Sequence, residues 1–238
     1  MQWTKERLRL LRTRSGFYLR SESMTRLEVF SDTAFAFALT MLVVSVGSIP
    51  SNHSELILAL KNVPAFFLSF VQIVAFWWAH RVWSQRYGLE STTATVLTLS
   101  MIFTILVFIY PLRLIYSGLC QFVSGGWLPG EFSVNSNREF ADLFVIYGVG
   151  YALLTAILTL LYLHAYHQRD ELALTEFESV KTKKMVAVFL IQVVFGVLSA
   201  LFALLSPPDI AIYAGFVYIG LGVFIPLANV AYEREVSR

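Results

Sequence analysis

Long apolar runs alternate with short polar segments along the whole chain. A helix needs about 20 residues to cross the roughly 30 Å of hydrocarbon in a bilayer, and six runs meet that requirement. The pattern therefore predicts an all-α, polytopic integral membrane protein with six transmembrane helices. The expected spans are residues 30–48, 63–83, 95–117, 143–166, 185–205 and 210–229.

The polar segments divide the chain into three parts. Residues 25–232 are expected to form the six-helix membrane domain, residues 1–24 a basic N-terminal segment, and residues 233–238 a short tail. Leucine and aromatic residues are scattered among the arginines of the N-terminal segment, a composition that suits a helix lying on anionic lipid. A disordered tail that only fixes topology is an equally open interpretation.

Basic residues indicate which side of the membrane the polar segments occupy. Lysine and arginine in short loops stay cytoplasmic, and 15 of the 18 lie before Phe30, in the second and fourth loops, or after the sixth span. Lys61, Arg113 and Arg138 are the remaining three. This distribution predicts a multi-pass protein of the cell membrane with both termini in the cytoplasm.

Composition narrows the possible functions. With 57% hydrophobic and 14% charged residues, the chain is unlike a soluble domain. The basic residues behind its net charge of +2 lie mainly in the loops expected to be cytoplasmic. The chain also has no glycine-rich phosphate loop, so we expect no nucleic-acid partner. The single cysteine, Cys120, excludes an intrachain disulfide and a thiolate metal cluster. Nothing in the sequence calls for a cofactor.

The first span begins with polar residues. Thr25 and Glu28 have capping-box spacing, and Asp32 follows at the edge of the hydrocarbon, where an ionised carboxylate is costly. Such a carboxylate needs a partner. Trp77 and His80 share one face of the second span at a similar depth, so we expect them to donate hydrogen bonds to the Asp32 or Ser31 face. Arg26 would complete this polar cluster. A simple interfacial aromatic belt is the alternative.

A second face of the same span carries bulky apolar groups and small hydroxyls. At about 100° per residue, one stripe contains Thr33, Phe37, Thr40, Met41, Val44 and Ser48, with Asp32 roughly 140° away from Phe37. The stripe suits a narrow, mostly dry passage. Lipid-facing or core packing would give the same row, and periodicity alone does not decide between them.

The start of this span resembles a known signature. Arg26, Phe30, Ser31 and Asp32 form the sequence Arg-x-x-x-Phe-Ser-Asp, which is similar to the motif that opens the first helix of the transmembrane protein 175 family, the lysosomal and bacterial potassium channels. The Leu-Ser-Phe run and the Trp77-x-x-His80 pattern of the second span resemble the same family, as does the six-span layout.

The resemblance implies a potassium channel, not an enzyme, in which the first helix of each subunit lines a central pore. A chain with one six-span repeat would assemble as a homotetramer. By offset from Asp32, the resemblance assigns the pore constriction to Phe37, Met41 and Val44 and a selectivity layer to Thr40. It implies conduction of potassium ions, weakly preferred over sodium, without a carbonyl filter. Phe37 and Thr33 depart from the family's usual aliphatic residue and glycine.

Three other functions remain open. Asp32 and His80 would serve a proton- or ion-coupled transporter as a relay. His164, His167 and Glu171 have a spacing that suits metal ligation on one helix face, which raises the possibility of a membrane metalloenzyme. A membrane scaffold without transport activity is the third.

Overall fold

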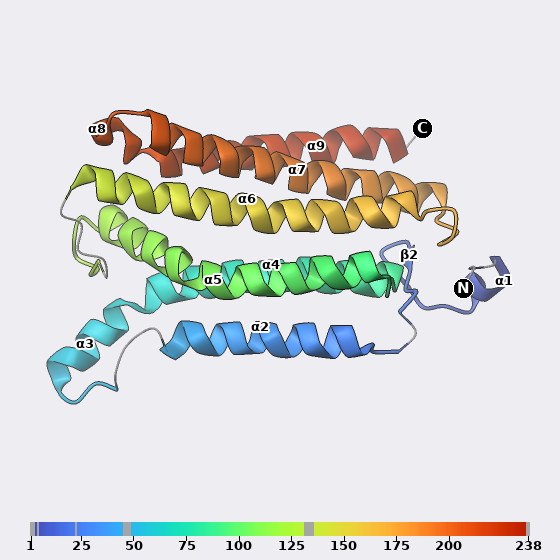
Figure 1. Ribbon diagram of the computed structural model, residues 1–238, viewed down its shortest axis with the longest axis horizontal. Coiled ribbons are helices and arrows are strands. Elements are labelled where there is room, and N and C mark those ends of the chain that lie inside the picture. Colours follow the sequence, from blue (N-terminus) through green and yellow to red (C-terminus); the bar gives the residue numbers. More distant parts are fainter. Residues whose placement is uncertain (1–2, 4, 22, 45–48, 131–135, 237–238) are drawn as a thin grey trace.

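Long helices lie side by side in the computed structural model, which describes residues 3, 5–21, 23–44, 49–130 and 136–236 (Figure 1). Five of them are α2 (Arg26–Val44), α4 (Val63–Tyr87), α5 (Thr92–Val123), α6 (Asn137–His167) and α7 (Glu176–Leu205). The last crossing joins a 3₁₀ helix, η1 (Ala214–Gly220), to α9 (Leu221–Val236). The short helices α3 (His53–Lys61) and α8 (Pro208–Ala211) connect long helices.

The all-α prediction with six membrane spans is confirmed. Among the described residues, six helical segments are long and apolar enough to cross a bilayer: residues 26–44, 63–87, 92–123, 137–167, 176–205 and 214–233. Most begin earlier or end later than the apolar runs suggest, because polar side chains cap them outside the run. Ser91 accepts from the amide of Ala94 at the start of α5, and Thr175 and Glu178 form a capping box at the start of α7.

The helices follow one another across the bundle from edge to edge. In Figure 1, α2 lies at one edge and α9 at the other. Along its length α2 packs on α4 and α5, α6 packs against α5 and α7, and α9 packs on α7. The buried side chains gather on α5 and α6 in the middle. The edge position leaves one face of α2 uncovered by the rest of the chain.

The described residues of the N-terminal segment form a short helix and a hairpin instead of one longer helix or an irregular tail. After α1 (Lys5–Arg9), strands β1 (Thr13–Arg14) and β2 (Phe17–Tyr18) form a small antiparallel hairpin. Phe17 is 2% exposed, with its ring edge-on to those of Tyr87 and Phe177. The aromatic residue thus finds a protein pocket at the ends of α4 and α7 instead of lipid.

Helix α1 and the end of α9 lie at the same end of the bundle (Figure 1), as expected for an even number of crossings. That this end is cytoplasmic stays a prediction from the basic residues. Ser48, the last residue of the predicted stripe, lies outside the described residues.

Candidate functional site

A capping box starts α2, as the sequence predicted. The amide of Thr25 donates to Glu28 Oε2 at 2.9 Å, and the amide of Glu28 donates to Thr25 Oγ1 at 3.1 Å. The other carboxylate oxygen of Glu28 accepts from Ser84 Oγ at 2.6 Å and from Ser21 Oγ at 3.2 Å. The first turn of α2 is therefore bound to the end of α4 and to the segment that precedes α2.

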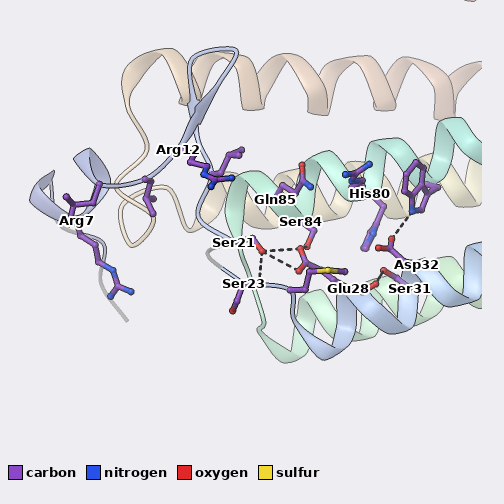
Figure 2. A pocket seen from close by; sticks show the side chains of 16 residues that line it. Arg7, Arg12, Ser21, Ser23, Glu28, Ser31, Asp32, His80, Ser84 and Gln85 are labelled. Carbon is purple, nitrogen blue, oxygen red and sulfur yellow. Dashed lines mark hydrogen bonds between the residues drawn. The ribbon is translucent and has the colours of Figure 1, made fainter.

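One turn further along, Asp32 faces α4. Its Oδ1 accepts a hydrogen bond of 2.8 Å from Trp77 Nε1 (Figure 2), as the shared depth of the two residues indicated. The Arg81 guanidinium lies over the Trp77 ring, 5.1 Å from its centroid. A carboxylate at the membrane boundary thus has both a donor and a nearby positive charge.

The expectation that His80 also donates to the Asp32 or Ser31 face is wrong. His80 is 3% exposed, and its Nε2 lies 3.0 Å from Thr98 Oγ1 of α5. Ser31 is buried and its hydroxyl donates to the carbonyl oxygen of Glu28, within its own helix, at 2.9 Å. His80 therefore joins α4 to α5 instead of α4 to α2.

The structure also does not bring Arg26 into the polar cluster. Arg26 and Phe30 are both exposed, because at about 100° per residue they fall on the far side of α2 from the α4 contact. The anchor between the two helices consists of the Asp32–Trp77 bond and the Ser84–Glu28 bond.

A cavity of about 840 Å³ opens beside this anchor (Figure 2). Glu28, Asp32 and His80 line one part of it. Arg7 and Arg12 of the N-terminal segment line another. Its lining mixes acidic, basic and hydroxyl side chains, and the N-terminal segment forms part of its wall.

The predicted stripe lies on the uncovered face of α2. Phe37 is 55% exposed and Val44 is 63% exposed, whereas Phe35 and Leu42 on the opposite face are buried. Thr33 and Thr40 are also exposed, but Met41 is partly buried against the core of the helix bundle. The hydroxyl of Thr40 donates to the carbonyl oxygen of Ala36 at 3.0 Å, so its proton is occupied and its oxygen is still able to accept.

The histidines of α6 are engaged elsewhere. His164 Nε2 lies 2.8 Å from Ser91 Oγ, and His167 Nδ1 lies 2.8 Å from the carbonyl oxygen of Leu163. Among the described residues, no three histidine, cysteine or acidic side chains come close enough together to hold a metal ion. The metalloenzyme hypothesis thus has no site in this part of the chain.

Two polar features escaped the sequence analysis. Arg20 and Glu178 form a buried ion pair, for which the only sequence signal is the capping-box spacing of Thr175 and Glu178. Gln72 Oε1 accepts from the hydroxyls of Tyr116 and Tyr147 in the middle of the bundle. These tyrosines come from α5 and α6, so no local pattern pointed to them.

Comparison with known proteins finds one family that the chain resembles. The family model described as endosomal/lysosomal potassium channel TMEM175 matches residues 26–111. A potassium channel of Marivirga tractuosa is 28% identical over 231 residues, which cover 94% of this chain and 92% of that protein. The chain is similar to the TMEM175 family.

The solved TMEM175 structures include a close match in fold. The crystal structure of the T38A variant of the potassium channel MtTMEM175, in complex with a nanobody–MBP fusion protein, superposes with a TM-score of 0.80 at 26% identity. The superposition covers 95% of this chain and 99% of the MtTMEM175 chain. The region matched by the family model begins at Arg26 and contains the Asp32–Trp77 anchor and the exposed stripe of α2. The family model and both of these relatives are described as potassium channels.

Proposed function

We propose that the protein is a homotetrameric channel that conducts potassium ions, with weaker passage of sodium, through a pore lined by the uncovered face of α2. Both termini lie in the cytoplasm. The relative from Marivirga tractuosa is described as a potassium channel, and the similarity to the TMEM175 family supports the same activity for this chain.

One observation carries the proposal. The face of α2 that bears Phe37, Thr40 and Val44 is exposed in a single subunit, while the opposite face packs on α4 and α5. Purely lipid-facing helices have no need of aligned hydroxyls, yet Thr33 and Thr40 both lie on this face. Four copies that turned this face toward a shared axis would enclose a narrow passage.

The side chains define what such a passage does. Rings of Phe37 and Val44, with Met41 at the edge of the stripe, form apolar constrictions that gate by dewetting. An ion that crosses them loses part of its hydration shell, which costs less for potassium than for the smaller sodium ion. The Thr40 hydroxyl oxygens replace some of the lost water. Selectivity obtained in this way is modest, because no ring of backbone carbonyls takes part.

Asp32 holds α2 in place instead of lining the pore. Its carboxylate points to Trp77 of α4, on a different face from Phe37. The hydrogen bonds of Asp32 and His80 run to different partners, Trp77 and Thr98. This separation favours a channel over a transporter that would pass protons directly between Asp32 and His80.

The test is potassium flux from liposomes that contain the purified full-length protein, with the oligomeric state measured by native mass spectrometry. We expect downhill potassium efflux, slower sodium efflux, and a tetramer. Protein-free liposomes provide the baseline. Potassium accumulation against its gradient would favour the transporter, and a silent tetramer would favour the scaffold.

A further inference from the structure

A buried ion pair docks the N-terminal segment on the helix bundle. The side chains of Arg20 and Glu178 are both 0% exposed. Two guanidinium nitrogens of Arg20 donate to the two carboxylate oxygens at 2.9 and 2.8 Å, the bidentate geometry that fixes orientation as well as distance. Arg20 Nε also donates to the carbonyl oxygen of Leu172 at 2.9 Å. One side chain thus joins the N-terminal segment to α7 and to the loop before it.

Further bonds converge on the same carboxylate. The amide of Tyr18 donates to Glu178 Oε1 at 2.9 Å, and the amide of Thr175 donates to Glu178 Oε2 at 3.0 Å. Next to it, the Arg86 guanidinium lies over the buried Phe17 ring, 4.0 Å from the ring centroid. Loss of either charged partner would leave the other charge buried and unpaired. This destabilises a fold far more than the loss of an exposed ion pair.

The docked segment leads directly into α2. Arg20 also donates to the carbonyl oxygen of Arg86 at 3.3 Å, near the end of α4, and the amide of Ser21 donates to the carbonyl oxygen of Gln85 at 3.3 Å. Ser21 Oγ then donates to Glu28 in the first turn of α2, where Ser84 of α4 donates as well. A chain of bonds therefore connects Glu178 on α7 with the start of the edge helix α2.

We propose that the Arg20–Glu178 pair positions α2, and that it sets how far the stripe of Phe37, Thr40 and Val44 turns toward the pore. The proposal rests on the proposed function, since it assumes that α2 lines the pore. Arg20 and Glu178 are positioning residues, and they act through Ser21, Ser84 and Glu28. Helix α2 packs along one face and depends on this anchor at its first turn, so a looser anchor lets the helix rotate or slide.

The primary variant is Glu178→Gln in the full-length protein. Glutamine keeps the size of the side chain and an acceptor for the Thr175 cap but leaves the buried Arg20 charge unpaired. We expect faster hydrogen exchange at the amide of Tyr18, a several-fold slower potassium flux and a lower potassium-to-sodium flux ratio. Asp142→Asn is the matched control, because it breaks the 3.1 Å pair between Arg138 and Asp142, whose side chains are 43% and 53% exposed. The control should change none of the three quantities.

A second variant tests whether the effect passes through α2. Ser84→Ala removes the bond from α4 to Glu28. If both substitutions act on the same helix, the change in flux ratio in the double variant Ser84→Ala, Glu178→Gln should differ from the sum of the changes in the two single variants. Additive changes, or faster exchange at Tyr18 with unchanged flux and flux ratio, would overturn the positioning proposal and leave the channel function intact.

If Glu178→Gln fails to fold, Arg20→Met combined with Glu178→Gln removes both charges and leaves neither unpaired. This double variant is expected to show the same slower flux and lower flux ratio, and wild-type values for both would overturn the proposal. Absence of flux in the wild-type protein would contradict the proposed function itself, and the positioning proposal with it.

Discussion

The indole Nε1 of Trp77 lies 2.8 Å from Oδ1 of Asp32, so a hydrogen bond between residues 45 positions apart ties α2 to α4. Both residues are partly buried. This bond explains why a carboxylate is retained at the membrane boundary, where it would otherwise destabilise insertion of the helix.

Trp77→Phe should destabilise the protein. The substitution keeps an aromatic ring but removes the donor, and a hydrogen bond to a charged group contributes about 1.5–3 kcal/mol. For a chain of this size each kcal/mol corresponds to about 2–4 °C in Tm. Thermal unfolding of the purified protein in detergent, followed by circular dichroism, measures the shift.

Trp78→Phe is the control for that experiment. Trp78 is the adjacent residue, is 46% exposed, and lies about 100° around α4 from Trp77. We expect little change in Tm for this variant. An equal loss of Tm in both variants would show that ring size, and not the bond to Asp32, accounts for the effect.

Phe37→Ala should raise ion leak and reduce the preference for potassium. Four alanines in place of four phenyl rings would widen and wet the proposed constriction, and a barrier lower by about 1.4 kcal/mol already gives a tenfold faster rate. We expect potassium and sodium efflux from liposomes to increase on the order of tenfold, with sodium gaining more.

Val43→Ala is the control that distinguishes a pore-lining position from a lipid-facing position on α2. Val43 is 55% exposed, as is Phe37, but it lies about 120° around α2 from Phe37. Its truncation should leave both ion fluxes near the wild-type values. Equal effects of the two variants, or unchanged fluxes in Phe37→Ala, would remove Phe37 from the proposed constriction.

Thr40→Val should lower the flux of potassium relative to sodium. Valine has nearly the shape of threonine, so the change removes the oxygen that replaces ion hydration and little else. We expect a several-fold smaller flux ratio in the liposome assay. The matched control is Thr159→Val, since Thr159 donates to the carbonyl oxygen of Thr155 in the same way at 2.8 Å but belongs to α6, outside the proposed pore. A similar loss in both variants would argue against a specific layer at Thr40.

Sequence reasoning predicted the features whose determinants are local. The capping box of α2 follows from three-residue spacing, and the Asp32–Trp77 bond follows from the depth of the two residues in neighbouring helices. The stripe of α2 follows from helical periodicity, and the six spans follow from hydropathy. None of these predictions required knowledge of how more distant helices pack.

Features that depend on helix rotation or on distant segments were missed. The partner of His80 is Thr98, and only the rotation of α5 brings that hydroxyl to it. The Arg20–Glu178 pair joins residues 158 positions apart, with no pattern that links them. The hairpin strands have two residues each, too few to show an alternating pattern.

Gly88→Ala should destabilise the docking of the N-terminal segment. Gly88 ends α4 with a φ of 56°, a left-handed conformation that costs a residue with a Cβ roughly 1–2 kcal/mol. An added Cβ would also lie 2.8 Å from the carbonyl oxygen of Arg20, part of the backbone held by the ion pair to Glu178. This overlap adds about 1–3 kcal/mol, and the backbone has little freedom to relieve it.

Gly125→Ala separates the two contributions. Gly125 has a φ of 62° and no atom within 4 Å of the position a Cβ would take, so its substitution carries the conformational cost alone. We expect Gly88→Ala to lower Tm by more than Gly125→Ala and, unlike it, to speed hydrogen exchange at the amide of Tyr18. Equal shifts in Tm, with no change in exchange at Tyr18, would mean that the segment around Arg20 does not rest against the end of α4. Because α2 begins six residues after Arg20, that result would also remove the physical link through which the N-terminal segment holds α2.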